Sequence, residues 1–138
     1  MGGGKNYWGE RMAEQLGYAF FDGDDAATPE MITRVSKFKP LTREIVQNYV
    51  NQLCSTVIEI AKYDDLVVAQ ALYFDQDRRY IHYILTCLGH RVTFKWVKPG
   101  FWQNLKQVYS RPNGLRWALY WLMNKPWFQK PTHDYDMV

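Results

Sequence analysis

The sequence has few of the residues that mark metal-binding or disulfide-rich proteins. It contains only two cysteines, Cys54 and Cys87, and three histidines, His82, His90 and His133. The cysteines form no Cys-X-X-Cys pair, and the histidines lie too far apart along the chain for a standard zinc signature. Without a secretory segment, this pattern predicts two buried thiols, no structural zinc site and a reducing, cytoplasmic location.

Long hydrophobic runs and an excess of one charge are also missing. The 138 residues include 17 Lys and Arg and 14 Asp and Glu, and the formal net charge is only +3. The two signs are interspersed, which argues against nucleic acid as a partner, and no stretch is long enough to span a membrane. The composition favours one domain, 1–138, that binds a nucleotide or another small anion.

Aromatic residues, in contrast, are abundant. They make up 17% of the chain, with six Trp, and most of them fall in its last third. Such density is typical of a hydrophobic core, but a ligand groove or a partner surface would also use it. The sequence leaves the role of these aromatics open.

Helix and strand patterns alternate along the chain and predict an α/β fold. In the helix 5–16, Trp8, Met12 and Leu16 recur every four residues as the predicted buried stripe. The hydroxyls of Thr28 and Thr42 are predicted to cap the next two helices. The predicted strands are 18–21, 66–72 and 92–97, and further helices are predicted at 75–88, 99–109 and about 115–124.

Two motifs point to chemistry. Gly2 to Lys5 present backbone N–H groups and an ammonium at a helix start, like the second half of a phosphate-binding loop. The first glycine of that motif is missing, and Asn6 stands where Ser or Thr is usual. The acidic run Asp22–Asp25 follows a strand, where α/β sheets bind ligands. The alternatives are a flexible N-terminal start and a solvated turn that caps the next helix.

In their order along the chain these motifs resemble the small P-loop metabolite kinases, most closely the gluconate kinases and then the shikimate kinases. The resemblance implies a P-loop NTPase-like three-layer sandwich with a small parallel sheet. The first and fifth strands of that family are expected to be absent here. The matching stretches are Gly4–Gly9, Leu16–Tyr18, Phe21–Asp25, Pro29–Glu30, Lys39–Thr42, Val67–Leu72, Trp96–Lys98, Arg111 and Phe128–Pro131.

The resemblance also implies ATP and Mg²⁺ as cofactors and a hydroxyl of a small sugar acid or polyol as the phosphate acceptor. It assigns roles to residues as follows. By this resemblance Lys5 and Asp24 would be catalytic, and Asn6 and Asp22 would bind magnesium. The acceptor would be bound by Asp22, Asp24, Arg78 and Arg79. The nucleotide would be bound by Gly2, Gly3, Gly4, Lys5, Asn6 and Tyr7, and by Arg111 and Arg116 from a lid-like segment at about 110–124.

Departures from the family leave alternatives. Arg43–Val46 and Tyr73 differ from the family's substrate segments, so the acceptor is open, and a non-catalytic nucleotide-binding or protein-binding module is the chief rival. A nucleic-acid 5′-hydroxyl kinase is the other alternative. Because the family's first strand is central, strands 66–72 and 92–97 are expected to pair directly, to borrow a strand from a second copy, or to leave the chain marginally folded.

Overall fold

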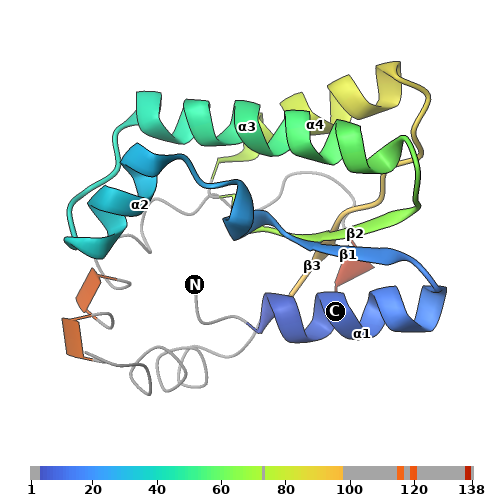
Figure 1. Ribbon diagram of the computed structural model, residues 1–138, viewed down its shortest axis with the longest axis horizontal. Helices are drawn as coiled ribbons and strands as arrows, with labels where there is room; N and C mark the ends of the chain where they lie inside the picture. Colours follow the sequence, from blue (N-terminus) through green and yellow to red (C-terminus); the bar gives the residue numbers. More distant parts are fainter. Residues whose placement is uncertain (1–3, 73, 98–114, 117–118, 121–135, 138) are drawn as a thin grey trace. The chain divides into compact units, whose positions relative to one another are not determined.

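The computed structural model of the chain describes residues 4–72, 74–97, 115–116, 119–120 and 136–137 (Figure 1). The chain divides into two compact units, residues 5–71 and residues 1–4 with 72–138, which are described separately. The elements are α1 (Lys5–Leu16), β1 (Ala19–Asp22), the 3₁₀ helix η1 (Gly23–Ala26), α2 (Pro29–Ser36), α3 (Arg43–Ala61), β2 (Leu66–Ala69), α4 (Asp75–Cys87), β3 (Lys95–Trp96) and β4 (Asp136–Met137).

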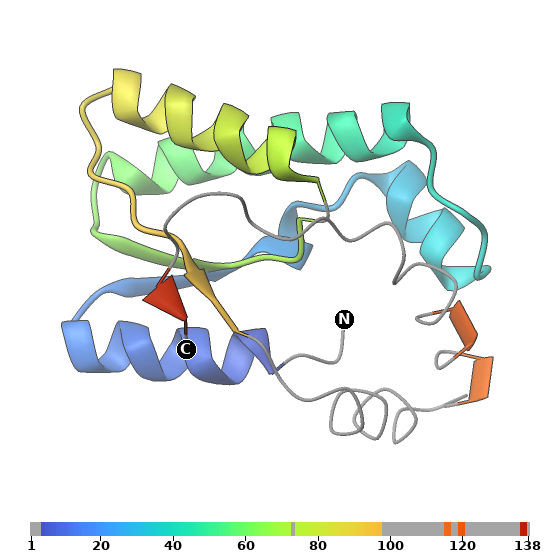
Figure 2. The same ribbon diagram turned by 180° about the vertical axis from the view of Figure 1, so that it is seen from behind.

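The unit 5–71 is built on a two-stranded parallel sheet. β1 pairs with β2 in the register Ala19 to Leu66 through Asp22 to Ala69. α1 lies on one side of this sheet and α3 on the other, as both views show (Figures 1 and 2). The parallel pairing of these two strands and the α/β class agree with the sequence-based prediction. β2 is shorter than predicted, since its ladder ends at Ala69.

α1 begins and ends where the sequence predicts. Gly17 ends it in the left-handed region, at φ 69°. The N–H of Tyr18 donates to the carbonyl of Ala13 at 2.9 Å, which is the glycine-terminated helix end that satisfies orphan carbonyls. The chain therefore reverses within two residues and enters β1 directly.

The buried face of α1 differs from the predicted one. Gly9 and Ala13 are its buried residues, whereas Trp8 is 45% exposed and Leu16 53% exposed. A Cβ placed on Gly9 would lie 2.8 Å from Cε2 of Phe20, so the helix approaches β1 more closely than a side chain allows. The predicted stripe was wrong at Trp8 and Leu16 because close packing selects small residues here rather than large ones.

Threonine caps fix the starts of α2 and α3 as predicted. Oγ1 of Thr28 accepts from the N–H of Met31 at 3.3 Å, and Oγ1 of Thr42 accepts from the N–H of Ile45 at 3.2 Å. Each bond satisfies one N–H that has no partner within the helix. α3 then supplies most of the core of this unit through Ile45, Tyr49, Val50, Leu53, Cys54 and Val57.

In the other unit, α4 carries the buried residues Ile81 and Leu85, and β3 pairs in parallel with β4. The predicted absence of a last strand was therefore wrong, since Asp136 and Met137 pair with Lys95 and Trp96. The described ladders join β1 with β2 and β3 with β4, so direct pairing of 66–72 with 92–97, one of the three expected alternatives, is not found among them. The other two alternatives stay predictions.

Further sequence-based predictions have mixed outcomes. Cys54 is buried, but Cys87 is exposed, so the prediction of two buried thiols was wrong for Cys87. No helix in the described part of the chain is long and apolar enough to cross a membrane. The predicted helix 99–109 and most of the lid-like segment 110–124 lie outside the described residues.

The tight approach of α1 to the sheet gives a stability prediction. Gly9→Val puts a branched side chain against Phe20 and Ala69, and we expect it to lower the free energy of unfolding by about 1–3 kcal/mol, as overpacking does. Glu10→Val is the matched control, because it introduces the same side chain at the next, exposed position of α1. Urea unfolding measures both, and equal stabilities would contradict the close packing.

Candidate functional site

The start of α1 and the end of β1 meet because of their lengths. α1 has 12 residues and is about 18 Å long, and residues 18–22 extend for about 17 Å in the opposite direction. The reversal at Gly17 therefore brings the chain back to the level of Lys5 by the time it reaches Asp22. Figure 1 shows the start of α1 and η1 at the same end of this unit.

The ammonium of Lys5 is the centre of a cluster of side-chain oxygens. Its Nζ lies 3.3 Å from Oδ1 of Asp22, 3.1 Å from Oδ2 of Asp24 and 2.9 Å from Oδ1 of Asn6. The side chain of Lys5 is 20% exposed, that of Asp22 24% and that of Asp24 62%. The structure thus brings together four residues that the sequence assigned to one site. We call Lys5, Asn6, Asp22 and Asp24 the lysine cluster.

Asp22 is held by three neighbours. Its Oδ1 accepts from the backbone N–H of Asp24 at 3.0 Å, and its Oδ2 accepts from Nδ2 of Asn6 at 2.5 Å. Partial burial by itself raises the pKa of Asp22, but these two hydrogen bonds and the charge of Lys5 outweigh it and hold the pKa below its ordinary value of 3.8. Asp22 therefore stays ionised, and it also caps η1, the turn-capping role foreseen as an alternative.

The turn that carries Asp24 is packed against the end of β2. A Cβ placed on Gly23 would lie 2.8 Å from the carbonyl oxygen of Ala69 and 3.0 Å from Cβ of Gln70. Because the first of these contacts is with the backbone, no side-chain movement relieves it. Only glycine fits between β1 and the chain that leaves β2.

Tyr49 is the residue of this region that sequence reasoning missed. It lies on the buried face of α3, at 4% exposure. Its hydroxyl also donates to the carbonyl of Gly23 at 3.0 Å. A tyrosine among aliphatic residues on the buried face of a helix was the available signal, because a buried hydroxyl needs a partner.

The lysine cluster suits a divalent cation chemically. Oxygens from Asp22, Asp24 and Asn6 converge on the ammonium of Lys5, so the cluster as built binds a cation. Magnesium in kinase sites takes one or two carboxylates together with substrate phosphates. In the described part of the chain, no group of three His, Cys, Asp or Glu residues is arranged to hold a metal ion. The assignment of Asp22 and Asn6 to magnesium stays a prediction.

The residues before the cluster are described in part. Gly4 has a φ of 70°, a left-handed conformation that directs the chain into α1, whereas Gly2 and Gly3 lie outside the described residues.

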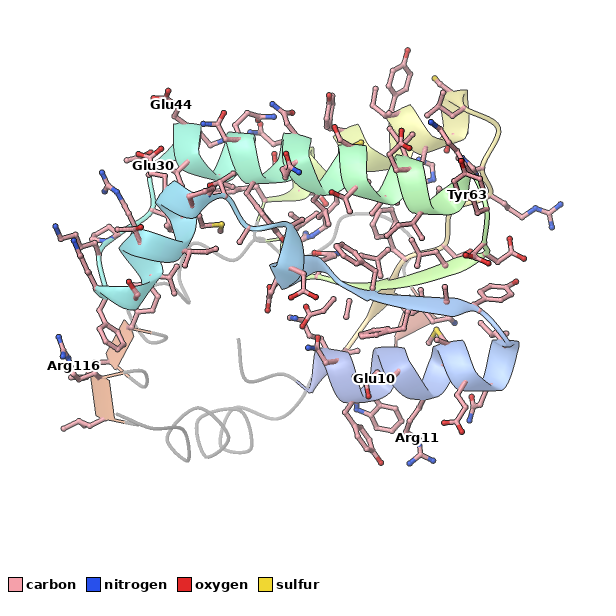
Figure 3. The ribbon with its side chains drawn as sticks, viewed as in Figure 1. Glu10, Arg11, Glu30, Glu44, Tyr63 and Arg116 are labelled. Atoms are coloured by element: carbon pink, nitrogen blue, oxygen red, sulfur yellow. The ribbon has the colours of Figure 1, made fainter. Side chains whose placement is uncertain are left out.

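Tyr7, predicted to bind nucleotide, is 56% exposed. Its hydroxyl accepts from Arg11 at 2.6 Å, and its ring packs edge-on against Trp8. Arg11 itself points away from the sheet (Figure 3).

The arginines predicted for the site lie in the other unit or outside the described residues. Arg78 is 4% exposed and donates to the carbonyl of Leu72 at 2.7 Å, with Asp75 at 3.6 Å. Arg79 pairs with the same aspartate at 2.9 Å. Arg116 is exposed (Figure 3), and Arg111 is not described. Their roles toward acceptor and nucleotide stay predictions.

A shallow pocket of about 480 Å³ on α2 contains none of the residues of the lysine cluster. The N–H groups of Phe38 and Lys39 donate to the carbonyls of Val35 and Arg34, and Phe38 has a φ of 55°. Arg34, Lys37 and Lys39 lie at this end of α2, where the helix dipole favours positive charge. The charged residues that line the pocket are therefore mostly basic. The pocket is lined by Pro29, Glu30, Thr33, Arg34, Lys37 and Lys39.

Comparison with solved structures identifies the kind of fold that holds this site. The chain is similar to the crystal structure of a gluconokinase from Sinorhizobium meliloti, with a TM-score of 0.77 and 20% sequence identity. The similarity covers 100% of this chain and 75% of the gluconokinase chain. No known sequence family and no characterised protein sequence matches the chain. The chain therefore has a gluconokinase-like α/β fold, shown by structure alone.

The lowered pKa of Asp22 makes stability depend on pH in a defined direction. A carboxyl whose pKa is lower in the folded than in the unfolded chain stabilises the fold above its unfolded value, and the stabilisation is lost as pH falls through the folded value. We expect the stability difference between the wild type and Asp22→Asn to be constant above about pH 5 and to shrink between about pH 4 and pH 2.

Urea unfolding across this range measures the effect. Glu59→Gln is the control, because Glu59 is 67% exposed and pairs only with the exposed Lys62 among its described contacts. The difference in free energy of unfolding between Glu59→Gln and the wild type should change little with pH. A difference for Asp22→Asn that is the same at acid and neutral pH would contradict the described contacts of Asp22.

Proposed function

We propose that the chain transfers the terminal phosphoryl group of ATP to a hydroxyl of a small sugar acid or polyol. The observation that carries the proposal is the position of Lys5 at the start of α1, within 3.3 Å of both Asp22 and Asp24. A helix start with a lysine binds phosphates, and a carboxylate opposite it receives the acceptor hydroxyl. The proposal includes the three-layer P-loop sandwich that the resemblance implies.

The charges of the lysine cluster favour ATP bound together with magnesium. One ammonium and two carboxylates leave the cluster with one net negative charge, which repels free ATP. Asp22 and Asn6 would hold magnesium, which would supply positive charge to offset that of the phosphates. Lys5 would then exchange its carboxylate partners for phosphate oxygens and stabilise charge on the transferred group.

Asp24 is the residue suited to the acceptor. Its side chain is the most exposed of the cluster, at 62%, yet its Oδ2 lies 3.1 Å from Lys5. A carboxylate that faces both solvent and the phosphate-binding ammonium can accept a proton from an incoming hydroxyl. The similarity to a gluconokinase supports a sugar acid such as gluconate as the first acceptor to test.

The direct experiment is an assay of ADP release with ATP, Mg²⁺ and a panel of sugar acids and polyols, with gluconate first. Acceptor-dependent release of ADP is the expected result. ATP binding without transfer to any acceptor would favour the non-catalytic alternative, and transfer to a 5′-hydroxyl oligonucleotide alone would favour the nucleic-acid kinase. Either result would contradict the proposal.

Lys5→Ala tests the phosphate-binding role. Removing the ammonium should weaken binding of ATP with Mg²⁺ by more than about tenfold, because charge-assisted contacts to phosphate are lost. Isothermal titration calorimetry measures the affinity. Lys62→Ala is the control, since it removes the same charge from an exposed ion pair at the end of α3. Equal affinities of the wild type and Lys5→Ala would refute the phosphate-binding role.

Asp24→Asn tests the acceptor role. We expect ATP affinity to change by less than about twofold while phosphoryl transfer falls by about a hundredfold or more, the range of a lost general base. Asp25→Asn is the matched control, because Asp25 is the next residue of the same turn and is exposed. Loss of nucleotide binding in Asp24→Asn would show that the assignment of Asp24 to the acceptor is wrong.

A further inference from the structure

The orientation of Asp24 depends on its backbone. Because its side chain is 62% exposed, packing does not fix where the carboxylate points. The peptide unit that joins Gly23 to Asp24 places the Cα from which this side chain extends, since a peptide unit is planar and moves as one body. The groups that bind this peptide unit therefore hold the carboxylate within reach of the Lys5 ammonium, which lies 3.1 Å from it.

Both ends of that peptide unit are bound. At one end the carbonyl of Gly23 accepts from the hydroxyl of Tyr49 at 3.0 Å. At the other end the N–H of Asp24 donates to Oδ1 of Asp22, also at 3.0 Å. Tyr49 comes from α3 and Asp22 from β1, so two separate elements hold one peptide plane. Rotation of the plane would break both bonds.

Tyr49 is suited to donate this hydrogen bond to the carbonyl of Gly23 permanently. Burial, together with the negative charges of Asp24 and Asp22, raises the pKa of Tyr49 well above its ordinary value of 10.0, so the hydroxyl stays protonated and donates. Phenylalanine would fill the same space without a hydroxyl that needs a partner. None of the other buried residues of α3 carries a hydroxyl: they are Ile45, Val50, Leu53, Cys54 and Val57.

We propose that Tyr49 is a positioning residue, which holds the peptide unit between Gly23 and Asp24 so that the Asp24 carboxylate faces Lys5. The bond from Tyr49 acts together with the close packing of Gly23 against the carbonyl of Ala69. The catalytic part of this inference rests on the proposed kinase function, whereas the structural part does not.

Tyr49→Phe removes the hydroxyl and keeps the ring. We expect hydrogen exchange at the Asp24 amide, followed by nuclear magnetic resonance, to become about tenfold faster while exchange in the rest of α3 changes little. With an active wild type, kcat should fall by about tenfold or more and the affinity for ATP with Mg²⁺ should change by less than about twofold, as expected from a displaced catalytic group.

Val57→Ala is the control for a general loss of stability. Val57 is buried on the same helix, about 12 Å further along it, and its truncation should lower the melting temperature without selective exchange at Asp24. Gly23→Ala is the second variant, because its Cβ would press on Ala69 and displace the same peptide unit. It should reproduce the loss of kcat.

The outcomes separate the two proposals. Unchanged exchange at Asp24 in Tyr49→Phe, or faster exchange with an unchanged kcat, would overturn the positioning role. A wild type without phosphoryl transfer would overturn the kinase function instead, and the exchange measurement would still decide whether Tyr49 holds Asp24.

Discussion

The described part of the site depends on the interaction of the Lys5 ammonium with Asp22 and Asp24. These two ion pairs, together with the hydrogen bond from Asn6 to Asp22, join the start of α1 to the end of β1 and to η1, which are separated by 16 or more residues along the chain. Two carboxylates this close would repel each other without a cation between them. Lys5 therefore fixes the arrangement of acidic groups that the proposed reaction uses.

Small residues allow these charged groups to meet. Gly9 lets α1 approach β1, and Gly23 lets η1 pack against the carbonyl of Ala69. With larger residues at either position, the helix and the turn would move outward, and Lys5 and Asp24 would separate. Close packing at Gly9 and Gly23, together with the hydrogen bond from Tyr49, therefore determines which charged groups of the site lie near one another.

The fold and the cluster are established by independent routes. The fold is similar to that of a gluconokinase over the whole chain, at an identity too low to carry residue roles. The cluster is defined by distances within residues 5–71, and these distances do not depend on that comparison. The phosphoryl transfer that we propose therefore rests on the cluster, and in that proposal the charge balance of the cluster favours ATP bound with magnesium.

The sequence by itself determined the features that arise within a few residues. The caps at Thr28 and Thr42 and the end of α1 at Gly17 follow from local hydrogen bonding. Only the tertiary structure decided which face of α1 is buried and that Tyr49 binds Gly23. Those features depend on the shape of the element packed opposite, which no local pattern of residues encodes.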